Sequence, residues 1–299
     1  MTEILKQTAL TLGFELVGVA AAREPSTFYR FEKWIDAGMH AGMDYLAVHR
    51  EARSHPNFVL ESVRSILMLG VSYDRVLAEA WHGVSAQYLP LRGVARYARG
   101  SDYHHWIRQR LRQLAVKHRE LYPDARCRGV VDTAPLLERQ FAVDAGLGHI
   151  GKNTMLIHPQ LGSTFFLAAL LSTEDWTPDT PSEASDPCGN CRRCLDACPT
   201  GALVESCILD ARRCLNYWTI EHRGEIPSEI TAVLGDRFFG CDTCQDVCPW
   251  NRPASEPDGV DPRSLDTETF AAAIAGTPLE RRFNQDFIKT GLAESEDRW

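Results

Sequence analysis

Ten cysteines are present in this 299-residue chain, and seven of them form two closely spaced runs. The first run reads Cys188-x2-Cys191-x2-Cys194-x3-Cys198-Pro, the spacing of bacterial ferredoxins, in which three thiolates hold one [4Fe–4S] cluster and the fourth ligates another. The second run has cysteines at positions 241, 244 and 248 and also ends before a proline. It is one ligand short, and Cys214 lies between the runs to complete it. Eight thiolates suffice for two [4Fe–4S] clusters, which predicts a protein that transfers electrons.

The same spacing predicts which thiolates share a cluster. The first cluster takes three ligands from the first run and one from the end of the second: Cys188, Cys191, Cys194 and Cys248. The second cluster takes the remaining four: Cys198, Cys214, Cys241 and Cys244. Two zinc sites are the alternative, because CxxC pairs also bind tetrahedral zinc. Cys207 is an alternative to Cys214 as a ligand, whereas Cys127 lies in an apolar stretch and is typical of a buried thiol.

Composition limits the classes of protein to consider. Hydrophobic residues make up 44% of the chain and charged residues 24%, which indicates a globular protein. The N-terminus lacks the basic start and apolar core of a secretory signal, and no apolar run is long enough to span a bilayer. We therefore expect a cytoplasmic protein, where disulfides are rare. A net charge of −8 argues against a large nonspecific nucleic-acid surface, although a local basic patch near the cysteines stays possible.

Hydrophobic periodicity predicts alternating helices and strands in the first part of the chain. Helices are expected at 2–12, 26–38, 102–120 and 135–145, and strands at 14–20, 65–73, 128–132, 153–158 and 163–171. This order favours an α/β or α+β layered domain over residues 1–182. The segment 177–187, rich in Pro, Ser and acidic residues, indicates a linker. A cysteine module over 183–255 and a tail over 256–299, with a surface helix or two and a loose end, complete the expected domains.

Three motifs in the first domain partly match nucleotide-binding or cobalt-binding patterns. Gly146-x-Gly148-x2-Gly151 matches the dinucleotide fingerprint, but the residues before it have helical character, so we expect a helix-capping glycine and a tight loop. The same segment does not match the motif of a phosphate-binding loop, because Asn153 follows the lysine where Ser or Thr is required. Asp102-x-His104 begins like the DxHxxG motif that ligates cobalt in some cobalamin enzymes, but Ile107 replaces the glycine.

Asp132 follows the apolar residues Gly-Val-Val and precedes Thr-Ala-Pro. An acid at the tip of a buried strand has a raised pKa when it is partly buried, and it then becomes a usable proton donor. The alternative is that Asp132 caps the following helix, since Pro135 and the residues after it suit a helix start.

Five segments together carry a resemblance to a known family. They are VDTAPLLER (131–139), GLGHIGKN (146–153), CGNCRRC (188–194), LDARRC (209–214) and FGCDTCQDVCPWN (239–251). With ARYARGSDYH (95–104) and the opening LGFELVGVA, the chain resembles the epoxyqueuosine reductases over about residues 1–255. The resemblance implies an α+β protein with a nitroreductase-like cobalamin-binding domain, shared with reductive dehalogenases, and a ferredoxin-like domain with two [4Fe–4S] clusters. It implies the short form of the family, which lacks a C-terminal helical-repeat segment.

The activity implied is the reduction of epoxyqueuosine to queuosine in tRNA, the last step of queuosine formation. Cobalamin and the two clusters supply electrons, the VDT-x-P motif makes Asp132 the proton donor, and the protein acts as a monomer with an unassigned electron donor. Motif matches place corrin contacts at Arg53, Tyr97, Asp132, His149, Lys152 and Ser163. The family commonly has a tryptophan where this chain has His149. Candidate RNA contacts are Arg192, Arg193, Arg213, His222 and Arg223.

Two other functions compete with this one. The first is a cobalamin-dependent reductase of a small organic substrate, similar to the reductive dehalogenases, which would act without tRNA. The second is a two-cluster electron carrier whose first domain only docks a partner and binds no corrinoid.

Overall fold

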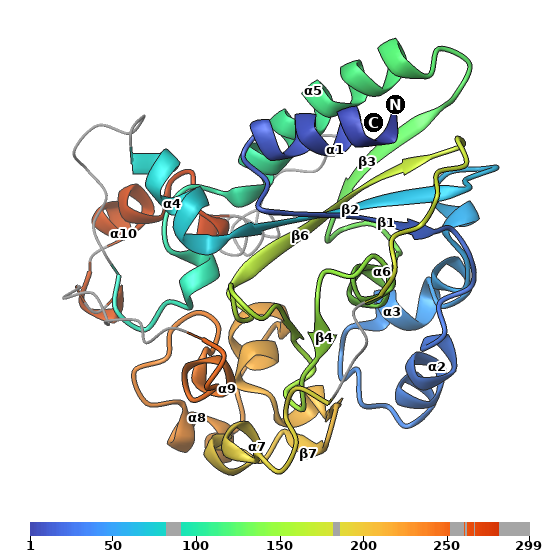
Figure 1. The fold of residues 1–299 in the computed structure, drawn as a ribbon. Coiled ribbons are helices and arrows are strands. Elements are labelled where there is room, and N and C mark those ends of the chain that lie inside the picture. Colours follow the sequence, from blue (N-terminus) through green and yellow to red (C-terminus); the bar gives the residue numbers. More distant parts are fainter. Residues whose placement is uncertain (82–90, 182–185, 252–259, 261, 266, 281–299) are drawn as a thin grey trace.

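A four-stranded antiparallel sheet forms the centre of the protein (Figure 1). The computed structural model describes residues 1–81, 91–181, 186–251, 260, 262–265 and 267–280. The sheet has the order β1-β2-β6-β3, with bounds Leu16–Ala21, Ser65–Ser72, Phe165–Ser172 and Cys127–Val131. β2 and β6 are the central strands and are buried along nearly their whole length, which explains their unbroken apolar sequences.

Helices cover both faces of this sheet (Figure 1). On one face, α1 (Thr2–Thr11) and α5 (Tyr103–Leu121) pack with Leu5 and Ile107 against Leu67 and Leu170. On the other face, α6 (Glu138–Asp144) packs with Phe141 against a second set of strand residues. The two apolar cores give the α/β/α layering of an α+β domain, as the sequence predicts.

The other described elements complete the two parts of the chain. In the first domain they are α2 (Phe28–Asp36), α3 (Asp44–Val48), η1 (Glu51–Arg53), η2 (Pro56–Phe58), α4 (Tyr73–Trp81), η3 (Arg96–Ala98), β4 (His149–Ile150) and β5 (Leu156–Ile157). The cysteine module contains α7 (Arg193–Ala197), β7 (Leu203–Glu205), β8 (Ile208–Leu209), η4 (Ala211–Arg213), the π-helix η5 (Tyr217–Glu221), α8 (Ser228–Leu234) and α9 (Thr243–Asp246). η6 (Pro262–Ser264) and α10 (Thr267–Ile274) follow. No helix within the described ranges is long and apolar enough to cross a membrane.

The end of α6 shows why the glycine-rich segment is not a nucleotide loop. The Leu147 amide donates to the Ala142 carbonyl at 2.9 Å, and the Gly146 amide donates to the Val143 carbonyl at 2.9 Å. With Gly146 at φ 76°, these bonds form a Schellman cap. A dinucleotide fingerprint needs a strand before the first glycine, and here α6 occupies that place. The expected capping glycine is therefore confirmed.

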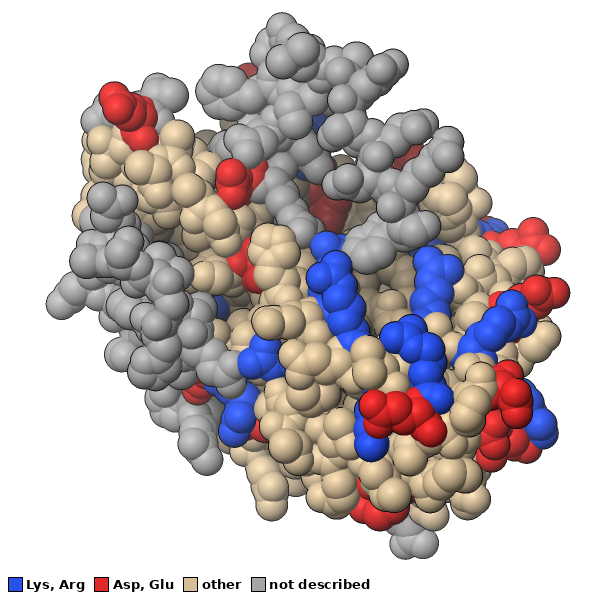
Figure 2. All heavy atoms as spheres, turned by 90° about the horizontal axis from the view of Figure 1, so that it is seen from above, with Lys and Arg blue, Asp and Glu red and all other residues tan. Residues whose placement is uncertain are grey.

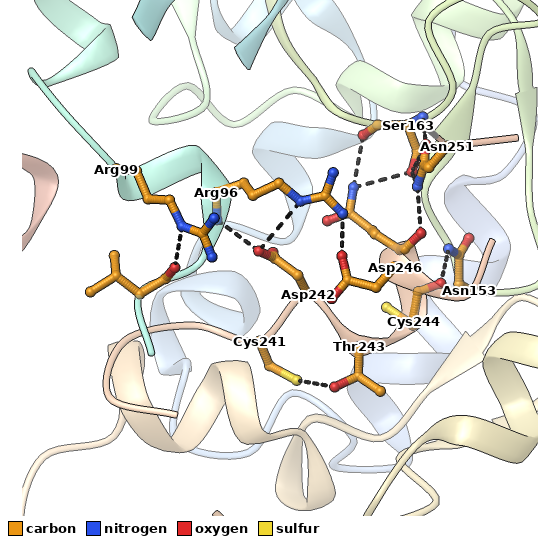
Figure 3. A network of polar contacts seen from close by, with 12 residues as sticks. Arg96, Arg99, Asn153, Ser163, Cys241, Asp242, Thr243, Cys244, Asp246 and Asn251 are labelled. Carbon is orange, nitrogen blue, oxygen red and sulfur yellow. Dashed lines mark hydrogen bonds and ion pairs between the residues drawn. The ribbon is translucent and has the colours of Figure 1, made fainter. Parts of the chain in front are cut away.

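Polar side chains join the cysteine module to the sheet domain (Figure 3). The Arg96 amide donates to Asp242 Oδ2 at 2.7 Å, and the Arg96 guanidinium also pairs with Asp246. On the opposite side of α9, Asn251 Oδ1 accepts from the Ser163 amide at 2.6 Å. A Cβ atom at Gly162 would lie 2.1 Å from that same Asn251 oxygen, so this approach requires glycine. The two parts are therefore held in close and specific contact.

Part of the expected tail belongs to the folded body. Ala273 and Ile274 of α10, together with Leu279, are buried against Leu91 and Phe239. The expected helix is present as α10, and its buried side covers an apolar surface that the first domain and the cysteine module share. The expected loose end lies in 281–299, outside the described residues.

Candidate functional site

The first predicted set of thiols lines a single cavity. Cys188, Cys191, Cys194 and Cys248 all contribute to the wall of a space of about 230 Å³. Cys248 comes from the second run, so the chain brings it across to the first run as the ferredoxin pattern requires. Around one zinc ion, four thiolates converge to within bonding distance of a single point. Nowhere in the described part of the chain do three or more His, Cys, Asp or Glu side chains converge so closely. The open cavity fits an inorganic cluster better than a zinc ion.

The second predicted set also comes together. Burial raises the pKa of Cys244, and the negative charges of Cys241 and Cys214 raise it further. Cys214 is likewise close enough to Cys241 and Cys198 for their charges to raise its pKa, after the larger effect of burial. Cys207 lies elsewhere, and its thiol donates to the Gly151 carbonyl at 3.4 Å. The structure therefore places Cys214, rather than Cys207, beside the other three thiols.

Backbone amides point at two of these sulfurs. The Ala202 amide donates to Cys198 Sγ at 3.2 Å, and the Lys152 amide donates to Cys188 Sγ at 3.4 Å. Lys152 Nζ also donates to the Gly189 carbonyl at 2.5 Å and to the Cys191 carbonyl at 3.0 Å. Hydrogen bonds to cluster sulfurs raise reduction potentials. The structure thus places Lys152 at the first cysteine run, and the corrin contact expected of it is not seen in the pocket described next.

A second cavity of about 230 Å³ lies in the sheet domain. Its wall is mostly aromatic and apolar, with phenols and carboxyl groups at a few points. The lining residues are Tyr73, Tyr97, Tyr103, Asp132, Glu138, Arg139, Met155, Leu156, Ser163, Phe165, Phe166 and Leu167. They come from the turn after β3, from β5 and the start of β6 with the residues just before them, from the starts of α4, α5 and α6, and from η3.

Asp132 is held in this pocket by two neighbouring residues of α5. The Tyr103 hydroxyl donates to Asp132 Oδ2, and His104 Nε2 pairs with Asp132 Oδ1 at 2.9 Å. The other ring nitrogen of His104 pairs with Asp102 Oδ1 at 2.6 Å. The Asp132 side chain is 40% exposed, whereas that of His104 is only 9% exposed. The Asp132 carboxyl is therefore the accessible member of the hydrogen-bonded series Asp102–His104–Asp132. Because α6 begins at Glu138, the alternative that Asp132 caps this helix is wrong.

The pKa shifts in this network favour a proton held on His104. Burial lowers the pKa of His104, but its hydrogen bonds to the carboxylates of Asp102 and Asp132 outweigh this effect, so the pKa is raised. Burial, followed by the Asp132 charge, raises the pKa of Tyr103, which therefore stays a neutral donor. Both ring nitrogens of His104 are engaged by carboxylates, so this histidine cannot serve as a ligand to cobalt. This agrees with the incomplete DxHxxG motif.

Of the other expected corrin contacts, two line this pocket and two do not. Tyr97 lines the pocket, and burial raises its pKa, so it stays a neutral phenol. Ser163 also lines it, but its hydroxyl is bonded to Asn251 Nδ2 at 3.0 Å. Arg53 is outside the lining, although its charge reaches Glu138. His149 pairs with Ile157 in the β4–β5 ribbon and is also outside the lining.

The sequence predicts no function for Tyr103, His104 or Glu138, although all three interact with Asp132 in the structure. In the sequence, Tyr103 and His104 belong to a segment of family resemblance and His104 to an incomplete motif, while Glu138 only falls within the segment 131–139. Tyr103 and His104 lie at the first turn of α5, next to the N-cap Asp102. Neither a buried strand that ends in an acid nor a helix that begins Asp-Tyr-His is distinctive in the sequence. Only the tertiary structure brings these two segments into contact.

We expect Asp102→Asn to lower turnover by about 10- to 100-fold, less than loss of the acid itself, because positioned acids and bases contribute ~10²–10⁴-fold. Without the Asp102 carboxylate, the pKa of His104 falls, and the store of protons behind Asp132 is weakened at neutral pH. Turnover in single-turnover assays between pH 5.5 and 8 measures this. The loss should shrink at the acidic end, where the histidine is protonated without its partner. A pH-independent loss would contradict this role for the pair.

The expected RNA contacts occupy two parts of the cysteine module. Arg192 and Arg193 lie at the start of α7, and Arg193 lines the cavity of the first cysteine set. Arg213 ends η4, while His222 and Arg223 follow the π-helix η5. Arg192 pairs with Asp196 at 3.4 Å, but its side chain is 67% exposed.

On the face seen over α1 and α5, basic and acidic side chains are interspersed (Figure 2).

Comparison with known proteins gives family matches in both parts of the chain. Residues 53–133 match the model described as "Epoxyqueuosine reductase QueG, DUF1730", and residues 187–251 match the "4Fe-4S double cluster binding domain". The epoxyqueuosine reductase of Pseudomonas aeruginosa is 38% identical over 298 residues, covering 94% of this chain and 81% of the relative.

Solved structures agree with these matches. A crystal structure of epoxyqueuosine reductase with an epoxyqueuosine-modified tRNA-Tyr stem loop has a TM-score of 0.78 and 31% identity, covering 93% of this chain and 76% of that one. The Bacillus subtilis epoxyqueuosine reductase has a TM-score of 0.77 and 29% identity, covering 93% and 76%. A reductive dehalogenase shares the fold alone, with a TM-score of 0.52 and 17% identity, covering 91% and 35%.

The cysteine sets and the acid-bearing pocket thus occur in a chain whose relatives are similar along almost all of its length. The expected α+β fold with a double-cluster module is confirmed. The two competing functions are not favoured, since the close relatives are neither dehalogenases nor simple electron carriers. This chain belongs to the epoxyqueuosine reductase family.

Proposed function

We propose that this chain reduces epoxyqueuosine to queuosine in tRNA, with two [4Fe–4S] clusters, a bound cobalamin and Asp132 as proton donor. The observation that carries the proposal is the pairing of two four-thiol sets with a pocket whose exposed carboxyl is backed by Tyr103 and His104. The double-cluster model over residues 187–251 supports treating 183–255 as the cluster module and 1–182 as the catalytic domain. One chain supplies both thiol sets and the pocket, so we propose a monomer in the cytoplasm, where its RNA substrate is found.

The pocket suits a corrin in its chemistry. Its aromatic and apolar wall fits the faces of a macrocycle, and its phenols and carboxyl groups fit the amides at the edge of one. Glu138 Oε1 is closed off from solvent without a hydrogen-bond partner among the described residues, which marks space for a polar group. Tyr97, Asp132 and Ser163 are the expected contacts that lie in this wall. When bound, cobalamin supplies a strongly reducing cobalt for opening the epoxide.

The second thiol set lies behind the pocket wall. Gly240, next to Cys241, lies beside Tyr97, since a Cβ atom on Gly240 would be in ordinary van der Waals contact with the Tyr97 ring at 3.5 Å. Tyr97 also contacts Phe239, with 6.2 Å between the ring centroids. The first set opens instead on a cavity bordered by Arg193 and Trp250. We therefore propose that electrons enter at the first cluster and reach the pocket through the second.

Asp132 gives its proton to the epoxide oxygen, and the chain Asp102–His104–Asp132 replaces it. The buried imidazole holds the proton between two carboxyl groups, and the Tyr103 hydroxyl fixes the second oxygen of Asp132. The Bacillus subtilis enzyme is described with the catalytic loop of an aspartate swung out of the active site, which supports an acid on a loop at this place. In this chain, Asp132 lies on the turn that follows β3.

The activity is tested with the reconstituted holoprotein. Iron, sulfide and cobalamin are restored, a chemical reductant is added, and an epoxyqueuosine-containing tRNA stem loop is the substrate. Digestion and mass spectrometry should then show queuosine, and samples without cobalamin should show none. Protein that carries full iron and retained cobalamin but leaves epoxyqueuosine unchanged would refute the function.

RNA binding should weaken with salt, because phosphate contacts release counterions. We expect Arg192→Gln and Arg213→Gln each to weaken binding of the stem loop and to reduce the salt slope by about one, the effect of one lost phosphate contact. Arg64→Gln is the matched control, since Arg64 is an exposed arginine of the first domain that pairs with Asp175. Fluorescence anisotropy from 50 to 300 mM salt measures the slopes. If the salt dependence of binding has the same slope in all three variants, Arg192 and Arg213 do not contact the RNA.

A further inference from the structure

Glu138 is a second carboxyl group in the pocket of Asp132. It is the first residue of α6, and although part of the residue is exposed, its Oε1 atom is closed off from solvent. Among the described residues, this oxygen has no hydrogen-bond partner. Buried polar atoms are nearly always paired, and an exception in a pocket wall beside a reactive acid indicates a functional role.

The charged groups around Glu138 come from three segments. Asp132 lies on the turn after β3, Arg139 follows on α6, and Arg53 ends η1. The pocket also contains the phenols of Tyr73, Tyr97 and Tyr103, which burial keeps neutral. Burial, followed by the Asp132 charge, raises the pKa of Glu138 to about 8 against the opposing effect of the two arginines. Glu138 therefore carries a proton at neutral pH, when an ordinary glutamate does not.

The stoichiometry of the proposed reaction requires such a group. Both C–O bonds of the epoxide break, a C=C bond forms, and the oxygen leaves as water. This takes two electrons, which the clusters supply, and two protons, which the protein or solvent supplies. Asp132 holds only one proton at a time, and His104 reaches the pocket only through Asp132.

We propose that Glu138 supplies the second proton, to the oxygen that leaves as water, after Asp132 has supplied the first. This inference rests on the proposed function and deepens it. The two acids differ in the source that refills them. Asp132 is backed by the buried imidazole, whereas Glu138 has no such partner and takes its proton from solvent between turnovers.

Glu138→Gln tests the proposal, because glutamine keeps the shape and loses the acidic proton. In single-turnover assays on the epoxyqueuosine stem loop, the wild type should lose rate above about pH 8, where Glu138 ionises. Glu138→Gln should be slower by ~10²-fold at pH 7, within the usual range for a general acid, and should lack the decline above pH 8. Glu138→Asp should recover part of the rate. Glu61→Gln, at a side chain 86% exposed, is the matched control and should behave as wild type.

Two further readouts separate proton delivery from a structural role. Iron content and cobalamin retained after desalting should be unchanged in Glu138→Gln. Its melting temperature should exceed that of wild type by a margin that grows between about pH 5 and pH 8. The sign follows because wild-type Glu138 has a folded pKa above its unfolded one, so the native state loses stability as pH rises through that range.

A wild-type rate and pH profile in Glu138→Gln would overturn the inference, and so would a slow variant that has also lost cobalamin. Failure of the proposed function looks different. In that case the wild-type holoprotein itself leaves the epoxyqueuosine stem loop unreduced, while the pH-dependent difference in melting temperature persists.

Discussion

Asp132→Asn is expected to lose turnover by ~10²–10⁴-fold while keeping both clusters and its cobalamin. Asparagine still accepts the hydrogen bond from Tyr103 and fits the same space, but it has no proton to give to the epoxide oxygen. The loss should persist from pH 6 to pH 9, because amide groups do not titrate in this range. Single-turnover conversion of the epoxyqueuosine stem loop measures it.

The matched control is Asp175→Asn, because Asp175 is an exposed carboxylate, 58% accessible, that pairs with Arg64 at the surface. It should retain the wild-type rate. Iron analysis and the cobalamin spectrum establish that Asp132→Asn is loaded like wild type. A fully loaded variant that converts its substrate at the normal rate would exclude Asp132 from proton transfer.

Cys248→Ala is expected to disrupt the first cluster, although Cys248 belongs to the second run of the sequence. The structure places this thiol in the cavity of Cys188, Cys191 and Cys194, so its loss leaves that cluster with three protein ligands. We expect about half of the bound iron to be lost or converted to a smaller cluster, and turnover to fall below detection because the electron path is broken. Iron and sulfide analysis with EPR spectroscopy measures both effects.

Cys207→Ala is the matched control, because Cys207 is a thiol of the same module that bonds to Gly151 and not to the cluster sets. It should keep all of its iron. The double variant Cys188→Ala/Cys248→Ala should lose no more iron than either single variant, since both thiols serve one cluster. Iron losses that add, with a second EPR signal disappearing, would show that Cys248 belongs to the other cluster.

The chemistry of the cysteine module was predictable because its determinants are local. Cluster ligation depends on thiolates at short, fixed separations, and three of the first four ligands lie within seven residues of each other. The central strands were predictable for a similar reason, since β2 and β6 are buried on both sides and their sequences are apolar throughout. The buried face of α5 was also predictable, because its apolar residues recur with the period of a helix.

The role of Asp132 was not decided by its own neighbourhood, which suited a helix cap as well as a proton donor. The fold favours the proton donor in two ways. The backbone turns between β3 and α6, so the helix begins six residues after Asp132, at Glu138, and does not need its side chain. The first turn of α5 then brings Tyr103 and His104, 28 to 29 residues away in sequence, onto both carboxyl oxygens.

The iron–sulfur chemistry and the order of the elements could be predicted without the structure, because both follow from residue spacings within a few turns or strands. The groups that we propose to hold and transfer protons could be recognised only in the tertiary structure. The paired ring of His104, the closed-off oxygen of Glu138 and the engaged hydroxyl of Ser163 all result from contacts between distant segments. The pKa of a carboxyl or imidazole group depends on the burial and charges that surround it in space, and no local pattern of residues specifies them.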